Sequence, residues 1–239
     1  MATILATEGL SKRFGGVVAT DNVTLEIPDQ ELRCIIGPNG AGKSTLFALL
    51  CGIEQPDAGR VLVKGRDVTA LPAFQRVRLG MGLTFQTNRA YHNLTVRQNL
   101  EAPLRVGRAD RPKDADERLR FALELFGLDP ESSVLARELP HQQLQWLEIA
   151  MALAGGPDIL LLDEPTAGLS PEETRQTASV LRHLNEAGLT IVVVEHDIAF
   201  VREVARTVTV LHQGRIFAEG SVETITAHED VRRIYLGRA

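Results

Sequence analysis

Long apolar runs are missing from this sequence of 239 residues. No run approaches the ~18 consecutive apolar residues that indicate a membrane-spanning helix. The N-terminal stretch MATILATEGLSKRFGG also lacks the apolar core of a secretion signal. We therefore expect a cytoplasmic protein, in which any membrane role depends on a partner.

An excess of basic residues is missing as well. Lys and Arg number 26 against 31 Asp and Glu, which gives a net charge of −5. Proteins that bind nucleic acid usually carry a concentrated positive surface, so we expect no nucleic-acid partner. Cysteine is scarce, and Cys34 and Cys51 both lie in apolar segments. We interpret them as buried thiols rather than as a disulfide or a redox pair.

Glycine and lysine come together in one segment, GPNGAGKS at residues 37–44. It fits the phosphate-binding pattern G-x-x-x-x-G-K-[ST]. The glycines let backbone N–H groups turn toward an anion, Lys43 adds a charge for the β- and γ-phosphates, and Ser44 offers a hydroxyl to Mg²⁺. A short apolar strand before this loop and a helix after it direct the helix dipole at the phosphate.

The order of periodic segments predicts an α/β fold. Residues 1–36 alternate apolar and polar side chains, which favours antiparallel strands. Apolar runs at 158–163 and 190–195 favour parallel strands buried on both faces. Helices are predicted at 172–186 and 198–205. The chain is long enough for one large domain or for a core with one insertion.

Residues 87–153 differ from this pattern because they favour helices over strands, with an apolar stripe at Leu144, Leu147 and Met151. We interpret them as an inserted α-helical subdomain. The expected organisation is one domain, 1–239, in which 1–86 and 154–239 form an α/β core with an N-terminal antiparallel β subdomain.

Two acidic residues stand at the carboxyl end of the apolar run at 158–163. Asp163 is the last residue of this run and Glu164 follows it, at the edge where parallel α/β sheets bind ligands. Asp163 suits Mg²⁺ held through water, and Glu164 suits a general base for the attacking water. His196 follows the next apolar run, so we expect it at the same edge. The guanine-selecting pattern Asn-Lys-x-Asp does not occur, which argues against a GTPase.

The order of these motifs resembles the ATP-binding subunits of ABC transporters, which are P-loop NTPases, over nearly the whole chain. GPNGAGKST is similar to their Walker A motif, ILLLDEP to Walker B with the catalytic glutamate, LTFQ to the Q-loop, and VVVEHD to the switch histidine region. The resemblance implies hydrolysis of ATP with Mg²⁺. It assigns catalysis to Glu164, His196 and Lys43; nucleotide binding to Phe14, Gly37, Pro38, Asn39, Gly40, Ala41, Gly42, Lys43, Ser44, Thr45 and Gln86; and metal binding to Ser44, Gln86 and Asp163. Phe14 would stack on adenine, with core packing as the alternative.

Within the family, the sequence resembles importers for branched-chain amino acids and for urea or short-chain amides. The segments KRFGG, FQTNRAYHNLTVRQNL and IYLGRA carry this resemblance, and ELR with HQQLQWLEI leans toward the urea and amide branch. It implies two permease subunits, attachment through them to the inner face of the cell membrane, and an indirect link to a periplasmic or extracellular substrate-binding protein. An ATPase for lipopolysaccharide export and a poorly hydrolytic ATP-binding subunit stay as alternatives.

The signature loop departs from the family pattern. Where the family has Leu-Ser-Gly-Gly-Gln, this chain has Leu139, Pro140, His141, Gln142 and Gln143. Proline offers neither a hydroxyl nor an N–H, and the loss of donors aimed at developing charge costs ~2–4 kcal/mol. The D-loop that the resemblance assigns, at Ala167, Gly168, Leu169 and Ser170, has serine in place of the usual aspartate. We hypothesise a heterodimer with a second ATPase subunit, and a homodimer that tolerates these changes is the alternative.

Overall fold

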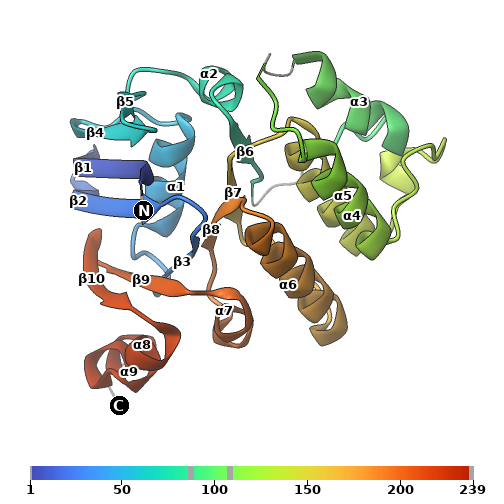
Figure 1. The fold of residues 1–239 in the computed structure, drawn as a ribbon. Helices are drawn as coiled ribbons and strands as arrows, with labels where there is room; N and C mark the ends of the chain where they lie inside the picture. The colour runs from blue at the N-terminus through green and yellow to red at the C-terminus, as the bar shows by residue number, and fades with distance from the viewer. Residues whose placement is uncertain (1, 86–88, 107–109, 237–239) are drawn as a thin grey trace.

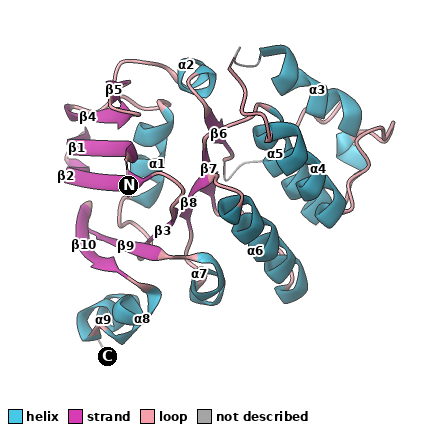
Figure 2. Ribbon diagram, viewed as in Figure 1, coloured by secondary structure: helices cyan, strands magenta, loops and turns pink. Residues whose placement is uncertain are grey.

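The computed structural model describes residues 2–85, 89–106 and 110–236, and two β-sheets with surrounding helices make up this part of the chain (Figures 1 and 2). The strands are β1 (Thr3–Phe14), β2 (Val17–Pro28), β3 (Leu32–Ile36), β4 (Ala58–Val63), β5 (Arg66–Asp67), β6 (Met81–Leu83), β7 (Ile159–Asp163), β8 (Thr190–Val194), β9 (Thr207–His212) and β10 (Arg215–Gly220). The helices are α1 (Lys43–Cys51), α2 (Ala73–Arg78), α3 (Val96–Val106), α4 (Ala115–Phe126), α5 (His141–Ala154), α6 (Pro171–Glu186), α7 (Ile198–Val204), α8 (Val222–Ala227) and α9 (Glu229–Leu236), with a 3-10 turn η1 (Ala136–Glu138).

The smaller sheet is antiparallel, in the order β2-β1-β4-β5. In β2, Val23, Leu25 and Ile27 are buried, whereas Thr24 and Glu26 are exposed. This alternation arises because successive side chains of a strand point to opposite faces. The predicted antiparallel strands near the N-terminus are therefore confirmed.

The larger sheet has the order β10-β9-β3-β8-β7-β6, and all its pairs are parallel except β9 with β10. Its central strands are buried on both faces, as predicted. On one face, Ile35, Leu161 and Val192 join Leu46 of α1 in an apolar cluster that also includes the small sheet. Helices α3 to α9 contribute to the cluster on the other face. Because parallel strands share a direction, the carboxyl ends of β3, β7 and β8 meet at one edge.

Helices α3, α4 and α5 lie together on one side of the molecule (Figure 1). Trp146 of α5 stacks on Phe126 of α4, with ring centroids 5.1 Å apart. Its indole N–H also donates to the hydroxyl of Thr177 on α6 at 3.0 Å. This single buried side chain thus joins three helices. No helix within the described ranges is both long and apolar enough to cross a membrane.

Two features differ from the sequence predictions. The strand predicted at 190–195 ends at Val194, so Glu195 lies outside the sheet ladder. The C-terminal helices α8 and α9 were not predicted, since helices this short show little apolar periodicity. Ser221 marks the start of α8, where its hydroxyl accepts from the N–H of Thr224 at 3.3 Å.

A buried arginine holds the C-terminal end of α1. Arg76 is 0% exposed, and its guanidinium donates to the carbonyls of Leu49 and Leu50 at 2.7 and 2.8 Å and to those of Thr69 and Leu71 at 2.9 Å. The last carbonyls of a helix have no intrahelical partner and form the negative end of its dipole. Arg76 therefore fixes the helix that follows the phosphate-binding loop.

Replacing Arg76 by Ala is expected to lower the free energy of unfolding by about 3 kcal/mol or more, because buried carbonyls lose their donors. Denaturant unfolding measures this change. Arg78→Ala serves as the control, since Arg78 is an exposed residue of the same helix and should cost no more than about 0.5 kcal/mol. Equal losses in the two variants would contradict the capping role.

Candidate functional site

The phosphate-binding loop connects β3 to α1, and its glycines are required by close backbone contacts. Gly42 has φ +99°, and a Cβ there would lie 2.2 Å from the carbonyl oxygen of Ala19. A Cβ on Gly37 would lie 2.4 Å from the carbonyl oxygen of Leu211. Both separations are shorter than any van der Waals contact allows. The loop is therefore packed between backbone segments of the two sheets, and only glycine fits at these positions.

Lys43 lies inside the loop that precedes it. Its Nζ donates to the carbonyl of Gly37 at 2.7 Å and to that of Pro38 at 3.3 Å. Burial lowers the pKa of Lys43, and the carboxylates of Glu164, Asp163 and Glu195 oppose this shift. The first turn of α1 carries no acidic residue, so the positive end of the helix dipole is available to an anion. Ser44 is exposed and Thr45 half-buried in this same turn.

Asp163 is the last residue of β7 and stands close to the loop. Burial, together with the charges of Glu164 and Glu195, raises its pKa to about 6, and Lys43 opposes the rise. Carboxylates therefore outnumber the lysine at this edge of the sheet. An additional positive charge here would be favoured, because it would stabilise the ionised carboxylates.

Glu164 and His196 lie close together at the same edge of the sheet, as predicted from their places after two apolar runs. The Nδ1 of His196 lies 3.4 Å from the Oε1 of Glu164. Glu164 has the left-handed φ of +48°, and its N–H donates to the carbonyl of Val194 at 2.9 Å. His196 is largely exposed and Glu164 is not, so the pair faces the solvent side of the sheet edge.

Phe14 lies at the turn between β1 and β2. It is 47% exposed, and the Nζ of Lys12 lies 5.3 Å from its ring centroid. Core packing, the alternative considered for this side chain, is therefore wrong. Its exposed ring is free to stack on a planar ligand. Gln86, the remaining candidate ligand, lies outside the described residues.

The altered signature, Leu139–Gln143, covers the start of α5. Pro140 precedes the helix, which has neither a side-chain cap nor an acidic residue in its first turn. The Nε2 of His141 lies 3.4 Å from the carbonyl oxygen of Ala167 in the D-loop. Ser170 caps α6 through a reciprocal pair of hydrogen bonds with Glu173.

Three polar residues near Glu164 were not assigned roles from the sequence. Glu195 accepts hydrogen bonds from Thr166, and the side-chain amide of Gln145 donates to the carbonyl of Glu164 at 3.3 Å. The position of Glu195 directly before His196 in VVVEHD is the sequence feature that could have indicated its role. Nothing in the sequence alone places Gln145 of α5 against the end of β7.

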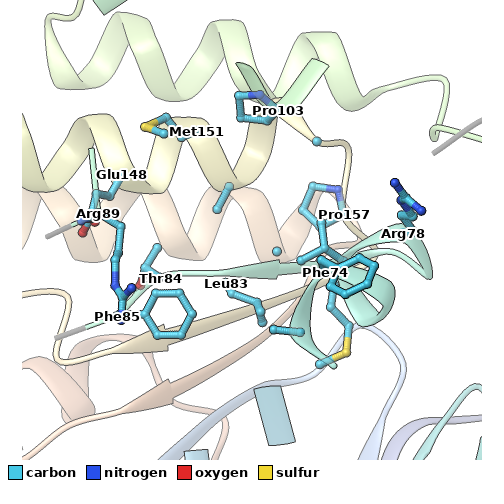
Figure 3. A pocket seen from close by; sticks show the side chains of 16 residues that line it. Phe74, Arg78, Leu83, Thr84, Phe85, Arg89, Pro103, Glu148, Met151 and Pro157 are labelled. Atoms are coloured by element: carbon cyan, nitrogen blue, oxygen red, sulfur yellow. Dashed lines mark hydrogen bonds between the residues drawn. The ribbon is translucent and has the colours of Figure 1, made fainter. Parts of the chain in front are cut away.

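A second feature is an apolar groove of about 280 Å³ between α2, β6, α3 and α5 (Figure 3). Its apolar lining includes Phe74, Leu83, Phe85, Pro103, Met151 and Pro157. Arginines stand over two of the aromatic rings: the guanidinium of Arg78 lies 5.7 Å from the ring centroid of Phe74, and that of Arg89 lies 5.0 Å from that of Phe85. The groove thus has a mainly apolar lining, with Glu148 as its acidic residue and with arginines at its rim.

Glu148 of α5 is a buried carboxylate in this groove. It is 8% exposed and accepts a hydrogen bond from the backbone N–H of Arg89. Burial raises its pKa to about 7, although the hydrogen bond and charge of Arg89 act in the opposite direction. The carboxylate is therefore partly protonated near neutral pH.

Fold and site together define a nucleoside triphosphatase of the P-loop class. The family model described as ABC transporter matches residues 20–167. The chain belongs to this family.

Individual relatives agree. The high-affinity branched-chain amino acid transport ATP-binding protein LivG of Escherichia coli K12 is 37% identical, over 99% of this chain and 98% of the relative. The ribose import ATP-binding protein RbsA 1 of Rubrobacter xylanophilus is also 37% identical, over 100% of this chain but 48% of that relative. The ADP conformation of MJ1267, an ATP-binding cassette of an ABC transporter, aligns with a TM-score of 0.85 at 30% identity over 100% of both chains. The predicted fold class and the predicted ATPase activity coupled to transport are confirmed.

The raised pKa of Glu148 gives a prediction for stability against pH. The folded form holds the proton more tightly than the unfolded form, whose pKa is near 4.5. Ionisation of the buried carboxylate therefore lowers the free energy of unfolding. This loss is small near pH 5, grows as the pH rises, and is complete above about pH 7. Glu148→Gln keeps an acceptor for the Arg89 N–H. It should raise stability at pH 8 by at most about 3 kcal/mol and have little effect near pH 5.

Thermal unfolding of the isolated chain at several pH values checks this prediction. Glu8→Gln, which neutralises an exposed carboxylate on β1, is the matched control. A stability difference between Glu148→Gln and the unmodified chain that did not grow from pH 5 to pH 8 would contradict it.

Proposed function

We propose that this chain hydrolyses ATP at its phosphate-binding loop and thereby powers an importer of branched-chain amino acids. The observation that carries the proposal is the meeting of Glu164 and His196 beside the loop, with 3.4 Å between Oε1 and Nδ1. Glu164 orients the attacking water as the general base, and His196 and Lys43 stabilise the γ-phosphate. Phe14 stacks on the adenine of ATP.

Mg²⁺ fits this edge of the sheet, since carboxylates outnumber the lysine there. No group of three His, Cys, Asp or Glu side chains able to hold a metal occurs within the described ranges. Mg²⁺ needs no such group, because it is usually held by one or two protein ligands together with phosphates and water. In the proposal Ser44, Asp163 and Gln86 hold it. When bound, it neutralises charge that develops on the phosphates.

Glu164→Gln is expected to leave ATP affinity unchanged and to lower kcat by about 100-fold or more, because general-base catalysis is lost while the phosphate-binding loop is intact. Nucleotide binding and phosphate release measure the two effects. Glu172→Gln, at the exposed start of α6, is the control and should change neither. Normal turnover by Glu164→Gln would remove Glu164 from the role of base.

The apolar groove supports a permease partner. We propose that this groove receives a helix of one membrane-spanning permease. Two such permease subunits take part in the proposed assembly and attach the chain to the inner face of the membrane. Exposed apolar surface rimmed by polar groups marks interaction sites, and a helix in an apolar groove is a common mode of recognition. The block 87–153, proposed as an inserted subdomain, carries motion from the nucleotide to this groove, since α3 and α5 belong to it.

The proposed substrate class is supported by the share of each relative's length that this chain matches, because the sequence identity is the same for relatives with different substrates. LivG and the ribose-import protein are each 37% identical to this chain, but the match covers 98% of LivG and 48% of the ribose-import protein. The segment HQQLQWLEI favours an importer of urea or short-chain amides as the second candidate.

The Glu164→Gln variant also serves in a test of which substrate the importer transports. A strain without the gene is expected to lose uptake of labelled leucine and to keep uptake of urea and acetamide. The unmodified gene should restore leucine uptake, and the variant should not. Loss of urea or acetamide uptake instead would assign the amide branch.

The altered signature supports an asymmetric pair of ATPase subunits. The N–H groups in the first turn of α5 have no side-chain cap and can still face an anion, but Pro140 supplies no donor and Gln142 adds a side chain where glycine permits close approach. In the proposal, Asp163, Glu164 and His196 work with the standard signature of a second ATPase chain. The signature of this chain completes a weaker second site.

ATP hydrolysis by the purified chain alone is expected to be about 100-fold slower than that of the pair, because donors to the γ-phosphate are missing. Pro140→Ser combined with Gln142→Gly should raise the activity of the isolated chain. The same changes in a Glu164→Gln background should give no gain. Full activity of the unmodified chain on its own would exclude the asymmetric pair in favour of a homodimer.

A further inference from the structure

Glu195 is a buried carboxylate at the catalytic edge that the hydrolysis step above does not use. It is 1% exposed and lies between the end of β8 and His196. Its Oε1 accepts from the hydroxyl of Thr166 and, at 3.3 Å, from the Thr166 backbone N–H. Its Oε2 accepts from the backbone N–H groups of His196 at 2.9 Å and Asp197 at 3.3 Å. One side chain thus joins the loop after β7 to the loop after β8.

Carboxylate chemistry suits this connection. A buried charge is costly unless hydrogen bonds compensate it, and the two loops here supply four donors. A carboxylate accepts at both oxygens, so it can serve both loops at the same time. An apolar residue at this position would leave the N–H groups of His196 and Asp197 without these acceptors.

The loop after β7 needs such support. Glu164 has φ +48°, a strained conformation for a residue with a side chain, which persists only where the surroundings hold it. Thr166 lies two residues further along the same loop and is anchored by Glu195. The N–H of Glu164 is in turn bonded to Val194, directly before Glu195. Glu164 is therefore held on one side by the end of β8 and on the other, through Thr166, by the loop that carries His196.

We infer that Glu195 is a positioning residue for ATP hydrolysis, which holds Glu164 and His196 at their working separation by joining Thr166 to the loop after β8. The inference rests on the roles proposed above for Glu164 and His196. It assigns to Glu195 no contact with the reacting atoms, and the inferred effect is geometric. The carboxylate also lies 3.7 Å from the Nδ1 of His196, and the comparison of Glu195→Gln with Glu195→Ala separates an effect of its charge from the geometric one.

Kinetics of a short series of variants test the inference. Glu195→Ala and Thr166→Val should each lower kcat at least about tenfold with an unchanged KM for ATP, because nucleotide binding does not depend on this connection. The double variant should be no worse than the poorer single variant, since the same contact is broken. Thr166→Ser and Glu195→Gln should recover most of kcat. In the latter, the glutamine carbonyl accepts from the N–H groups of His196 and Asp197, and its amide donates to the rotatable Thr166 hydroxyl. The longer hydrogen bond from the Thr166 backbone N–H, at 3.3 Å, is the one that is lost.

Hydrogen exchange in the nucleotide-free protein gives a readout that is independent of activity. The amides of Thr166, His196 and Asp197 should exchange faster in Glu195→Ala, whereas those of β3 should not change. Thr7→Val is the matched control. It removes a buried hydroxyl that donates to the carbonyl of Val23 at 2.9 Å in the small sheet, and it should lower stability without a change in kcat.

Distinct results would overturn the inference. Unchanged kcat in Thr166→Val, or in a folded Glu195→Ala, removes the positioning role. A Glu195→Gln variant as slow as Glu195→Ala means that Glu195 acts through its charge. If Thr7→Val lowers kcat as much as Thr166→Val does, at an equal loss of stability, then Thr166 and Glu195 have a structural role alone. Normal turnover by Glu164→Gln, in contrast, refutes the proposed function itself.

Discussion

Parallel pairing of β3, β8 and β7 is the constraint on which the rest of the structure depends. In this register Val194 pairs with Ile35 on one side and with Asp163 on the other. Glu164 and Glu195 directly follow Asp163 and Val194, and β3 ends one residue after Ile35, so the three strands end within one residue of the same level. A shift of one residue in any strand would turn its side chains to the opposite face. The edge at which we propose catalysis thus follows directly from the register, although its parts come from three distant segments.

Helix α1 connects this edge to the interior. It lies between the two sheets, and both of its ends are fixed. Its N-terminal loop is packed against Ala19 and Leu211, so that bulk on Gly42 or Gly37 would displace it. Its C-terminal carbonyls accept from Arg76. Because the dipole of a helix acts along its axis, fixing both ends also fixes where the positive end points. The phosphate binding proposed for this loop therefore depends on contacts at the far end of α1.

Local patterns in the sequence predicted the features that depend on local physics. Alternation located β2, apolar runs located β7 and β8, and the spacing of glycine and lysine located the phosphate-binding loop. The contacts that the sequence did not predict join residues far apart in the chain. Glu195 is bonded to Thr166, 29 positions earlier, and Arg76 to Leu49, 27 positions earlier. Periodicity in the sequence does not predict these side-chain hydrogen bonds, because they form only after the strands have paired.

Helix α5 and the altered signature at its start both contact the loop that follows β7 in this chain. Gln145, two residues beyond the signature, donates to the carbonyl of Glu164, and His141 of the signature lies 3.4 Å from the carbonyl oxygen of Ala167. A glycine in place of His141, as the family usually has, could not make the second contact. A Cβ on Gly168, which has φ +77°, would lie 3.1 Å from the Nε2 of His141. The imidazole therefore occupies space that a side chain in the D-loop would need, so the residues of the two loops are matched to each other. A change at the start of α5 consequently affects both the partner's nucleotide in the proposed pair and the backbone around this chain's own Glu164.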